Sequence, residues 1–361
     1  MTVPISTEFS TSSQIGTVLA VQANFYQVHL DEGSSILCTR RTRLKKIGQN
    51  VMVGDRVVIS IPENSEERGA ITKILPRQTE FQRPPVANAQ QILLLFALEA
   101  PTLDPWQLSR FLVKVESTPL KLCLCLNKKD LITEAQQQLW QERLLQWGYQ
   151  PIFTSIVKRQ GIDILKQHLN HQITIIAGPS GVGKSSLINT LIPEVEQRVS
   201  DVSGKLQHGR HTTRHVELFE LTDGGLLVDT PGFNQPELDS NPATLARYFP
   251  EARQRLLNQA CQFKNCSHRD EPNCAVRGDW ERYPHYLEFL QEMIAHQAVR
   301  KQLTLSESGL KRMIKQSGQE QYEPKLETKK YRRLSRRQKH QKLQGIYDNK
   351  TLEEMEELDE E

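Results

Sequence analysis

The sequence has little of what membrane proteins and disulfide-stabilised proteins need. Its longest uninterrupted apolar run, residues 92–98, is far too short to span a bilayer. Only six cysteines occur in 361 residues, which argues against a disulfide scaffold. Residues 1–4 provide neither a basic region nor an apolar core, so we expect no signal peptide. Together these features favour a soluble cytoplasmic protein with no membrane partner.

Charge is distributed unevenly along the chain, although the formal net charge is only +3. Lysine and arginine gather in residues 39–46 and 325–342, whereas residues 352–361 are almost purely acidic. This pattern favours an anionic polymer such as RNA as partner, although solvated charged segments are the common alternative. The acidic end would then shield the basic segment until RNA displaces it. The length is sufficient for two or three domains.

The most informative stretch runs from residue 173 to 186. A short apolar segment, Ile173–Ala177, is typical of a buried strand, and a G-x-x-x-x-G-K-[ST] pattern and the start of a helix follow it. Backbone N–H groups of such a loop surround phosphate oxygens, Lys184 would reach the β- and γ-phosphates, and Ser185 would bind Mg²⁺. A chance glycine-rich turn is the alternative. The predicted phosphate-binding residues are Gly178, Pro179, Ser180, Gly181, Val182, Gly183, Lys184, Ser185 and Ser186.

A guanine-recognition motif precedes this loop. Asn127, Lys128, Lys129 and Asp130 fit N-K-x-D and follow a predicted strand over 122–126. The carboxylate of Asp130 can accept from both the ring N–H and the exocyclic amino group of guanine, a donor pair that adenine lacks. Asn127 would contact the base edge and brace the phosphate loop, and the Lys128 stem would cover the ring. Ser155, after the next strand, is predicted to lie in the second base-contacting loop.

Downstream of the phosphate loop, the sequence offers the switch residues of a GTPase. Thr212 or Thr213 would complete the coordination of Mg²⁺, and the sequence alone does not choose between them. Asp229 and Gly232 fit D-x-x-G, in which the aspartate holds Mg²⁺ through water and the glycine N–H senses the γ-phosphate. In ordinary GTPases the guanine motif follows the phosphate motifs, so the order found here requires a circular permutation.

Phe233 stands where familiar GTPases carry a glutamine that orients the attacking water. A phenyl ring cannot do so by hydrogen bonding, so slow intrinsic hydrolysis, stimulated by a partner, is expected. His211 is the candidate catalytic side chain beside Lys184, and a structural histidine is the alternative.

A cysteine–histidine cluster follows the GTPase motifs with the spacing C-x4-C-x-H-x5-C. Three thiolates and an imidazole form a closed tetrahedral set that suits one structural Zn²⁺, with disulfides as the weaker alternative. We expect helices on both sides, over 243–259 and 280–300. The predicted ligands are Cys261, Cys266, His268 and Cys274.

The segment order predicts the architecture. Five short strands within residues 15–74 fit an all-β barrel of the OB type, and residues 40–46 form a basic loop that either contacts RNA or is solvated. Alternating strands and helices then predict an α/β P-loop GTPase domain with permuted topology. The expected parts are a disordered N-terminus over 1–13, an OB-fold RNA-binding domain over 14–76, a linker over 77–90, the GTPase domain over 91–240, an α-helical zinc-binding domain over 241–300 and a basic then acidic tail over 301–361.

Barrel, permuted GTPase and Cys/His cluster in this order resemble the small ribosomal subunit biogenesis GTPase RsgA family over about residues 14–300. The resemblance implies binding to the small ribosomal subunit and its rRNA late in assembly, subunit-stimulated hydrolysis of GTP, and release of the GDP form. We expect a monomer. Arg214 and Ile156 depart from the family's usual residues. Two alternatives remain: a permuted GTPase with another RNA or ribosomal client, and an RNA-binding scaffold with a vestigial nucleotide site.

Overall fold

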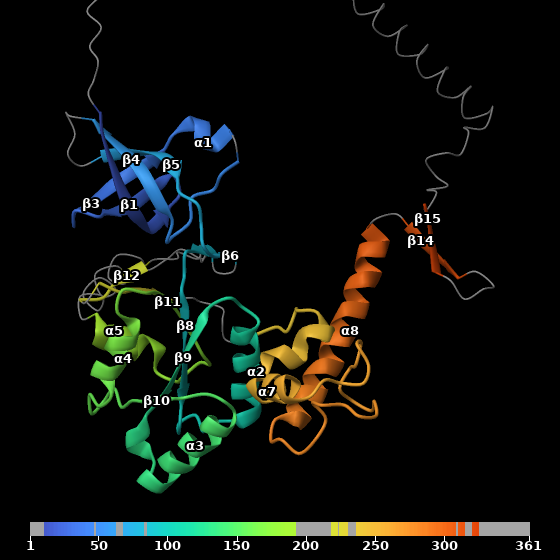
Figure 1. Ribbon diagram of the computed structural model, residues 1–361. Coiled ribbons are helices and arrows are strands. Elements are labelled where there is room, and N and C mark those ends of the chain that lie inside the picture. The colour runs from blue at the N-terminus through green and yellow to red at the C-terminus, as the bar shows by residue number, and fades with distance from the viewer. Residues whose placement is uncertain are drawn as a thin grey trace, which may run out of the picture. The chain divides into compact units, whose positions relative to one another are not determined.

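The computed structural model describes residues 11–46, 48–62, 68–82, 85–192, 218–222, 224–229, 236–307, 310–314 and 320–324 (Figure 1). The chain divides into two units, residues 1–293 and residues 294–361. The first unit contains a barrel, a six-stranded sheet and a helical region with the cysteines. The second is described separately below.

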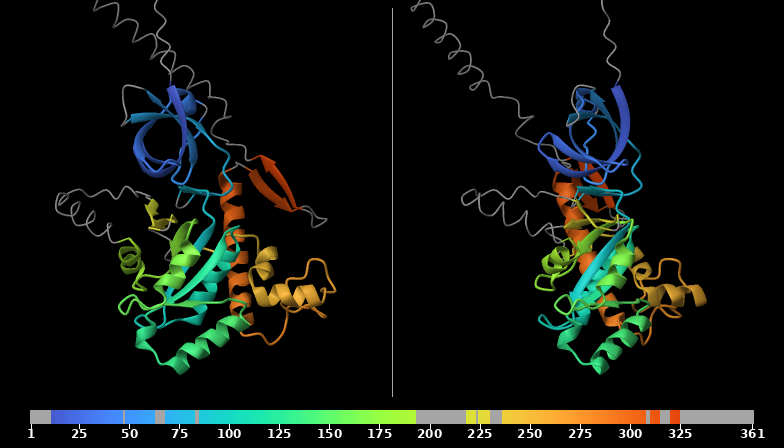
Figure 2. Two further views of the ribbon diagram at one scale, coloured as in Figure 1. Left: turned by 60° about the vertical axis from the view of Figure 1, so that its left-hand side comes forward. Right: turned by 90° about the vertical axis from the view of Figure 1, so that its left-hand side faces the viewer.

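The N-terminal part of the first unit is the predicted five-stranded barrel, drawn in blue in both views of Figure 2. The strands follow the order β1-β2-β3-β5-β4, and pairing of β1 with β4 closes the barrel. Its interior is filled by alternate side chains, among them Val28, Ile59 and Ile71, which are fully buried. The strands are β1 (Thr11–Gln22), β2 (Phe25–Leu30), β3 (Ser35–Arg40), β4 (Arg56–Pro62) and β5 (Arg68–Ile74).

The basic stretch after β3 differs from the predicted loop. Residues Thr42–Lys46 form a short helix, α1, because arginine, leucine and lysine all have high helix propensity. Leu44 is buried in the barrel core and fixes this helix. The basic segment is therefore an ordered part of the barrel.

The segment between barrel and sheet begins at a buried ion pair. The Asp55 carboxylate is fully buried and accepts hydrogen bonds from Arg77 Nε at 2.7 Å and Arg77 Nη2 at 2.9 Å. Arg77 also pairs with Glu80 at 2.8 Å. A small hairpin follows, made of β6 (Glu80–Gln82) and β7 (Pro85–Ala87). The predicted linker thus contains ordered structure that is fixed to the barrel.

The six-stranded sheet has the order β10-β9-β8-β11-β13-β12. All neighbouring strands are parallel except β12, which is antiparallel to β13. The chain enters at β8 in the middle, moves outward to β10 and returns to place β11 beside β8. It then forms the edge strand β12 before β13, which lies between β11 and β12. This is the predicted permuted order. The strands are β8 (Gln91–Ala97), β9 (Lys121–Asn127), β10 (Ile152–Phe153), β11 (Ile173–Ala177), β12 (Leu218–Glu220) and β13 (Leu226–Asp229).

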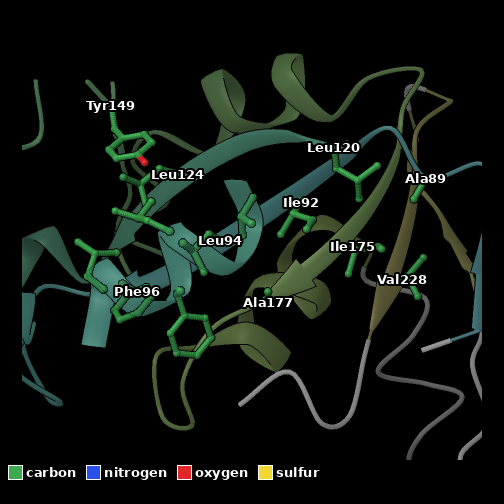
Figure 3. Close-up of a cluster of buried hydrophobic side chains, with 14 of the residues drawn as sticks. Ala89, Ile92, Leu94, Phe96, Leu120, Leu124, Tyr149, Ile175, Ala177 and Val228 are labelled. Atoms are coloured by element: carbon green, nitrogen blue, oxygen red, sulfur yellow. The ribbon is translucent and has the colours of Figure 1, made fainter. Parts of the chain in front are cut away.

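Helices cover both faces of the sheet, because its central strands are apolar on both faces. Ile92, Leu94 and Phe96 of β8 point to one face, where they pack with α2 and α3 (Figure 3). Leu93 and Leu95 point to the other face and pack with α4 and α5. The helices are α2 (Pro105–Glu116), α3 (Glu134–Gln146), α4 (Ile162–Leu169) and α5 (Lys184–Leu191).

The helical region after the sheet forms its own core around Phe249, Tyr286 and Phe289, and Val113 of α2 joins this core. The helix predicted over 243–259 is divided into the 3-10 helix η2 (Pro242–Tyr248) and α7 (Pro250–Asn258). Pro250 disfavours helical geometry at Phe249 and begins a new helix. The long helix α8 (Tyr283–Glu307) follows and continues into the second unit.

The second unit contains the end of α8 and an antiparallel hairpin of β14 (Leu310–Ile314) and β15 (Glu320–Pro324). The predicted basic segment 325–342 and the acidic end lie outside the described residues. In the part of the chain that the structure describes, no helix is long and apolar enough to cross a membrane.

Candidate nucleotide and metal sites

The phosphate loop and the guanine motif meet where the strand order reverses. β8 and β11 are neighbours in the sheet, and β9 lies on the other side of β8. In open α/β sheets, ligands bind outside the carboxyl ends of the strands at such a switch point. The loops after β9 and β11 both start at this edge, so the fold brings together motifs that are far apart in the sequence.

Two glycines of the phosphate loop have no room for a side chain. Gly178 has φ +145°, and a Cβ there would lie 2.0 Å from the carbonyl oxygen of Leu95 on β8. Gly183 has φ +102°, and its Cβ would lie 2.6 Å from Nδ2 of Asn127. Both contacts are far inside van der Waals distance, so the backbone geometry of the loop requires glycine at both positions.

The other phosphate-loop residues surround this backbone. Lys184 begins α5, and its Nζ donates to the carbonyl oxygens of Gly178 at 2.8 Å and Pro179 at 2.6 Å. Val182 is buried. The remaining predicted phosphate and magnesium contacts are exposed at the mouth of the loop: Ser180, Gly181, Ser185 and Ser186.

Asn127 connects the guanine motif to the phosphate loop. Its side chain is 2% exposed, and Nδ2 donates to the carbonyl oxygen of Val182 at 3.0 Å. Its Oδ1 accepts from the hydroxyl of Thr154 at 3.3 Å. The amide thus uses both its donor and its acceptor inside the protein, which places the two loops at a fixed distance from each other.

Lys128 provides a second connection between the loops. It has φ +62°, a left-handed conformation, and its Nζ donates to the carbonyl oxygen of Gly181 at 2.9 Å and to that of Ala100. The Lys128 stem therefore extends from the guanine motif to the phosphate loop and covers one side of the space between these two loops.

The predicted base-contacting groups lie at the same edge. Asp130 and Lys129 belong to the 3-10 helix η1 (Lys129–Leu131) and are half-buried. Within the described residues, the Asp130 carboxylate has no protein hydrogen-bond partner. Ser155 is fully buried, and its hydroxyl accepts from the backbone N–H of Lys158 at 3.1 Å. This bond shapes the turn after β10.

Sequence reasoning placed Thr154 beside Ser155 in the second base-contacting loop but missed its contacts with β9. Besides contacting Asn127, its hydroxyl lies 3.3 Å from Sγ of Cys125, and it is completely buried. A signal was present, because a hydroxyl residue at the carboxyl end of β10 must lie near the carboxyl end of β9 in a parallel sheet. The contact of Lys128 with Ala100 had no signal in the sequence.

The switch residues fall mostly outside the described part of the chain. This applies to His211, Thr212, Thr213, Gly232 and Phe233. Asp229 is the last residue of β13, where its backbone pairs with Ile176 of β11. The D-x-x-G motif therefore starts directly beside the phosphate loop.

The predicted cysteine–histidine cluster is formed. One donor atom from each of Cys261, Cys266, His268 and Cys274 lies within 4.8 Å of the other three. The Sγ atoms of Cys261 and Cys274 are 4.0 Å apart, and His268 Nδ1 is 3.5 Å from the first and 3.3 Å from the second. A tetrahedral Zn²⁺ with ordinary bond lengths gives S–S edges of about 3.8 Å and S–N edges of about 3.5 Å. The donor set and its spacing therefore fit zinc.

Residues around the cluster hold its loop against α8. Tyr286 donates to the carbonyl oxygen of Ser267 at 2.8 Å, and Tyr283 donates to that of His268 at 3.0 Å. Glu271 accepts from the hydroxyl of Ser267 at 2.6 Å and from the backbone N–H groups of Ser267 and Arg269. These three hydrogen bonds to Glu271 lower the pKa of its carboxyl to about 2. The cluster is thereby joined to the aromatic core of the helical region.

Fold and site together define a P-loop nucleotide-binding protein with the topology of a circularly permuted GTPase, preceded by a barrel and followed by a Cys3His cluster. The RsgA GTPase family model matches residues 74–239, and the RsgA N-terminal domain model matches residues 15–71. The chain therefore belongs to the RsgA GTPase family and is a GTP hydrolase.

Individual relatives agree over nearly the whole chain. The protein named small ribosomal subunit biogenesis GTPase RsgA from Trichormus variabilis is 58% identical, covering 94% of this chain and 98% of its own. Its namesake from Microcystis aeruginosa is 60% identical, covering 94% and 96%. The crystal structure of YloQ, described as a circularly permuted GTPase, is 31% identical with a TM-score of 0.66, covering 81% of this chain and 99% of its own.

Proposed function

We propose that this chain assists late maturation of the small ribosomal subunit. It binds the subunit, hydrolyses GTP to GDP and phosphate faster when bound, and leaves in the GDP form. The observation that carries the proposal is the extent of similarity: relatives named as small ribosomal subunit biogenesis GTPases match 94% of this chain at 58–60% identity. We propose that it acts as a monomer in the cytoplasm, where such a client would be assembled.

We propose the following roles for the predicted residues of the nucleotide site. Asp130 selects guanine, with Asn127, Lys128, Lys129 and Ser155 shaping the base pocket. The phosphate loop from Gly178 to Ser186 holds the phosphates, with Lys184 on the β- and γ-phosphates. Support comes from the bond between Asn127 and Val182, which sets the distance between base and phosphate pockets.

Chemistry at the γ-phosphate depends on Mg²⁺, which neutralises developing charge when bound with GTP. We propose Ser185 as one ligand, Thr213 or Thr212 as another, and Asp229 as a contact through water. The N–H of Gly232 reports the γ-phosphate. His211 is the proposed water-positioning residue, because Phe233 has no hydrogen-bonding group.

Zinc is the proposed metal of the Cys3His cluster. The four protein ligands would fill all four positions of a tetrahedral ion, which would then have a structural role and no catalytic one. Support comes from the spacing of Cys261, His268 and Cys274, which is that of a tetrahedral site.

We propose that the barrel binds RNA. Arg41, just before α1, and Arg43, within α1, are exposed on a barrel type that commonly binds oligonucleotides. Their charge would release counterions from rRNA and make subunit binding sensitive to salt.

The decisive experiment measures GTP turnover with and without isolated small subunits. We expect strong stimulation by small subunits and none by large subunits, and Lys184→Ala should abolish both basal and stimulated turnover. Equal stimulation by large subunits would redirect the proposal to another client. No stimulation by either would contradict a ribosomal role.

Base selection is tested separately. Asp130→Asn should weaken GTP binding and favour xanthosine triphosphate, because the new amide donates where the carboxylate only accepted. His211→Ala should lower the stimulated rate and leave GTP affinity unchanged, and an unchanged stimulated rate would remove His211 from the mechanism.

A further inference from the structure

Arg110 on α2 contacts two segments that lie far from it in the sequence. Its Nε donates to the carbonyl oxygen of Pro236 at 3.0 Å. Its Nη1 and Nη2 donate to the two carboxylate oxygens of Glu292, each at 2.6 Å. Pro236 belongs to the chain that follows the D-x-x-G motif, and Glu292 belongs to α8. One guanidinium group therefore bonds both to the chain that follows the D-x-x-G motif and to the helix that supports the metal cluster.

The surroundings hold this guanidinium in one orientation. Its carbon lies 5.6 Å from the ring centre of Trp106 and 5.7 Å from that of Phe289. Trp106 donates from Nε1 to Glu288 at 2.8 Å, which fixes the indole as well. The side chains of Arg110 and Glu292 are only 17% and 26% exposed. A bidentate, partly buried pair of this kind is strong and geometrically specific.

Other ion pairs on α2 contact only one of the two segments. Lys114 Nζ bonds to Asp239 at 2.7 Å, in the chain after the switch. Glu116 accepts from Arg253 of α7 at 2.5 Å, in the helical region. Within the described residues, Arg110 is the α2 side chain that bonds to both segments.

We propose that Arg110 is a positioning residue that couples the nucleotide site to α8, the helix that carries the metal-cluster contacts. The change of nucleotide that drives this coupling comes from the chain's GTPase activity. The coupling rests on the proposed function only in the second test below, which measures binding to the small subunit.

The coupling follows from the directionality of hydrogen bonds. The trigger that the proposal requires is a nucleotide-dependent displacement of the chain at Pro236, which follows the proposed γ-phosphate sensor in the sequence. The bond from Arg110 to Pro236 weakens steeply if the carbonyl turns away. The guanidinium then rotates as a rigid plane, and its two bonds to Glu292 cannot both be kept unless α8 follows. Lysine in its place has a single ammonium group and lacks the rigid fork that joins the two acceptors.

The first test compares hydrogen–deuterium exchange of residues 283–293 in the isolated protein, with GDP and with a non-hydrolysable GTP analogue. We expect a nucleotide-dependent difference in wild type that is lost in Arg110→Lys and Glu292→Gln. The matched control, Arg253→Met, breaks a different ion pair to α2 and should keep the difference. A wild type without the difference, or an Arg110→Lys protein that retains it, would overturn the proposal.

The second test measures small-subunit affinity in both nucleotide states. Typical couplings change affinity by about 5–150-fold. In Arg110→Lys the ratio of the two affinities should fall toward one, while GTP affinity of the isolated protein stays within about twofold of wild type. The double variant with Glu292→Gln should lose no more than either single variant, because both remove one connection. Since the exchange test needs no subunit, failure of subunit binding alone would contradict the proposed function and leave the coupling standing.

Discussion

The substitution Asn127→Asp tests the role of Asn127 most directly, because it replaces one buried NH2 group by an oxygen. In Asn127→Asp, the Nδ2 group that donates to Val182 becomes an oxygen, and the shape of the side chain is unchanged. Two acceptors, the new oxygen and the Val182 carbonyl oxygen, would then face each other across the 3.0 Å of the present hydrogen bond. The contact with the hydroxyl of Thr154 can persist. Only the connection to the phosphate loop is lost.

The magnitude follows from burial. Leaving a buried carbonyl oxygen without its donor costs about 1–3 kcal/mol. Because about 1.4 kcal/mol is a factor of ten, the GTP dissociation constant should rise by up to about 150-fold at a pH where the new carboxyl is ionised, the upper value applying when GTP binding must restore the whole loop geometry. A position that is 2% exposed raises the pKa of such a carboxyl, since burial disfavours the charged form. When pH falls through this raised pKa, the carboxyl gains a proton that it can donate to Val182, and affinity should partly recover.

The assay is titration of a fluorescent GTP analogue between about pH 5.5 and about pH 8, expressed at each pH as the ratio to wild type. Asn258→Asp is the matched control, because Asn258 is exposed at the end of α7. An Asn127→Asp protein that binds as tightly as wild type at the alkaline end would refute the bracing role. A loss that does not shrink on acidification would refute the hydrogen-bond explanation.

Three further predictions concern the loop, the core and the metal. In urea unfolding, Gly178→Ala should destabilise the protein by at least about 2 kcal/mol, and it should abolish GTP binding, because its Cβ would collide with β8. In Gly181→Ala the nearest neighbour of the new Cβ is 3.6 Å away, so this variant should lose only about 1–2 kcal/mol through backbone strain. Arg282→Met should cost about 3–5 kcal/mol, because it leaves the ion-pair partner of a fully buried arginine uncompensated; substituting both partners with apolar residues should recover most of this. Cys266→Ser should lower the zinc content measured by mass spectrometry and the melting temperature, and added zinc should raise the melting temperature of wild type only.

Much of the local structure was predictable from local signals. The barrel strands follow short β-branched segments between turns, as the alternating burial along β2 illustrates. Helix α3 begins at Glu134 because Thr133 and Gln136 form a capping box, a signal that is local in the sequence. The phosphate loop and the Cys3His cluster were predictable because their spacing is set by the ligand and not by the rest of the fold.

Long-range contacts were not predictable in the same way. No spacing rule connects Arg110 with Glu292, or Lys128 with the carbonyl oxygen of Gly181. Such pairs depend on how helices pack, which a single sequence does not specify. The division of the helix predicted over 243–259 has a local cause, because Pro250 disfavours helical geometry at Phe249 and starts a new helix.

The strand order also determines how the domain can form during translation. Synthesis proceeds from the N-terminus, so β8, β9 and β10 leave the ribosome with α2 and α3 before the phosphate loop exists. At that stage, Leu93 and Leu95 on the opposite face of β8 have no cover, because α4 and α5 are made later. After α4 is made, this face stays only partly covered until β11 and α5 complete the centre of the sheet, so nucleotide binding can stabilise the fold only near the end of the domain's synthesis.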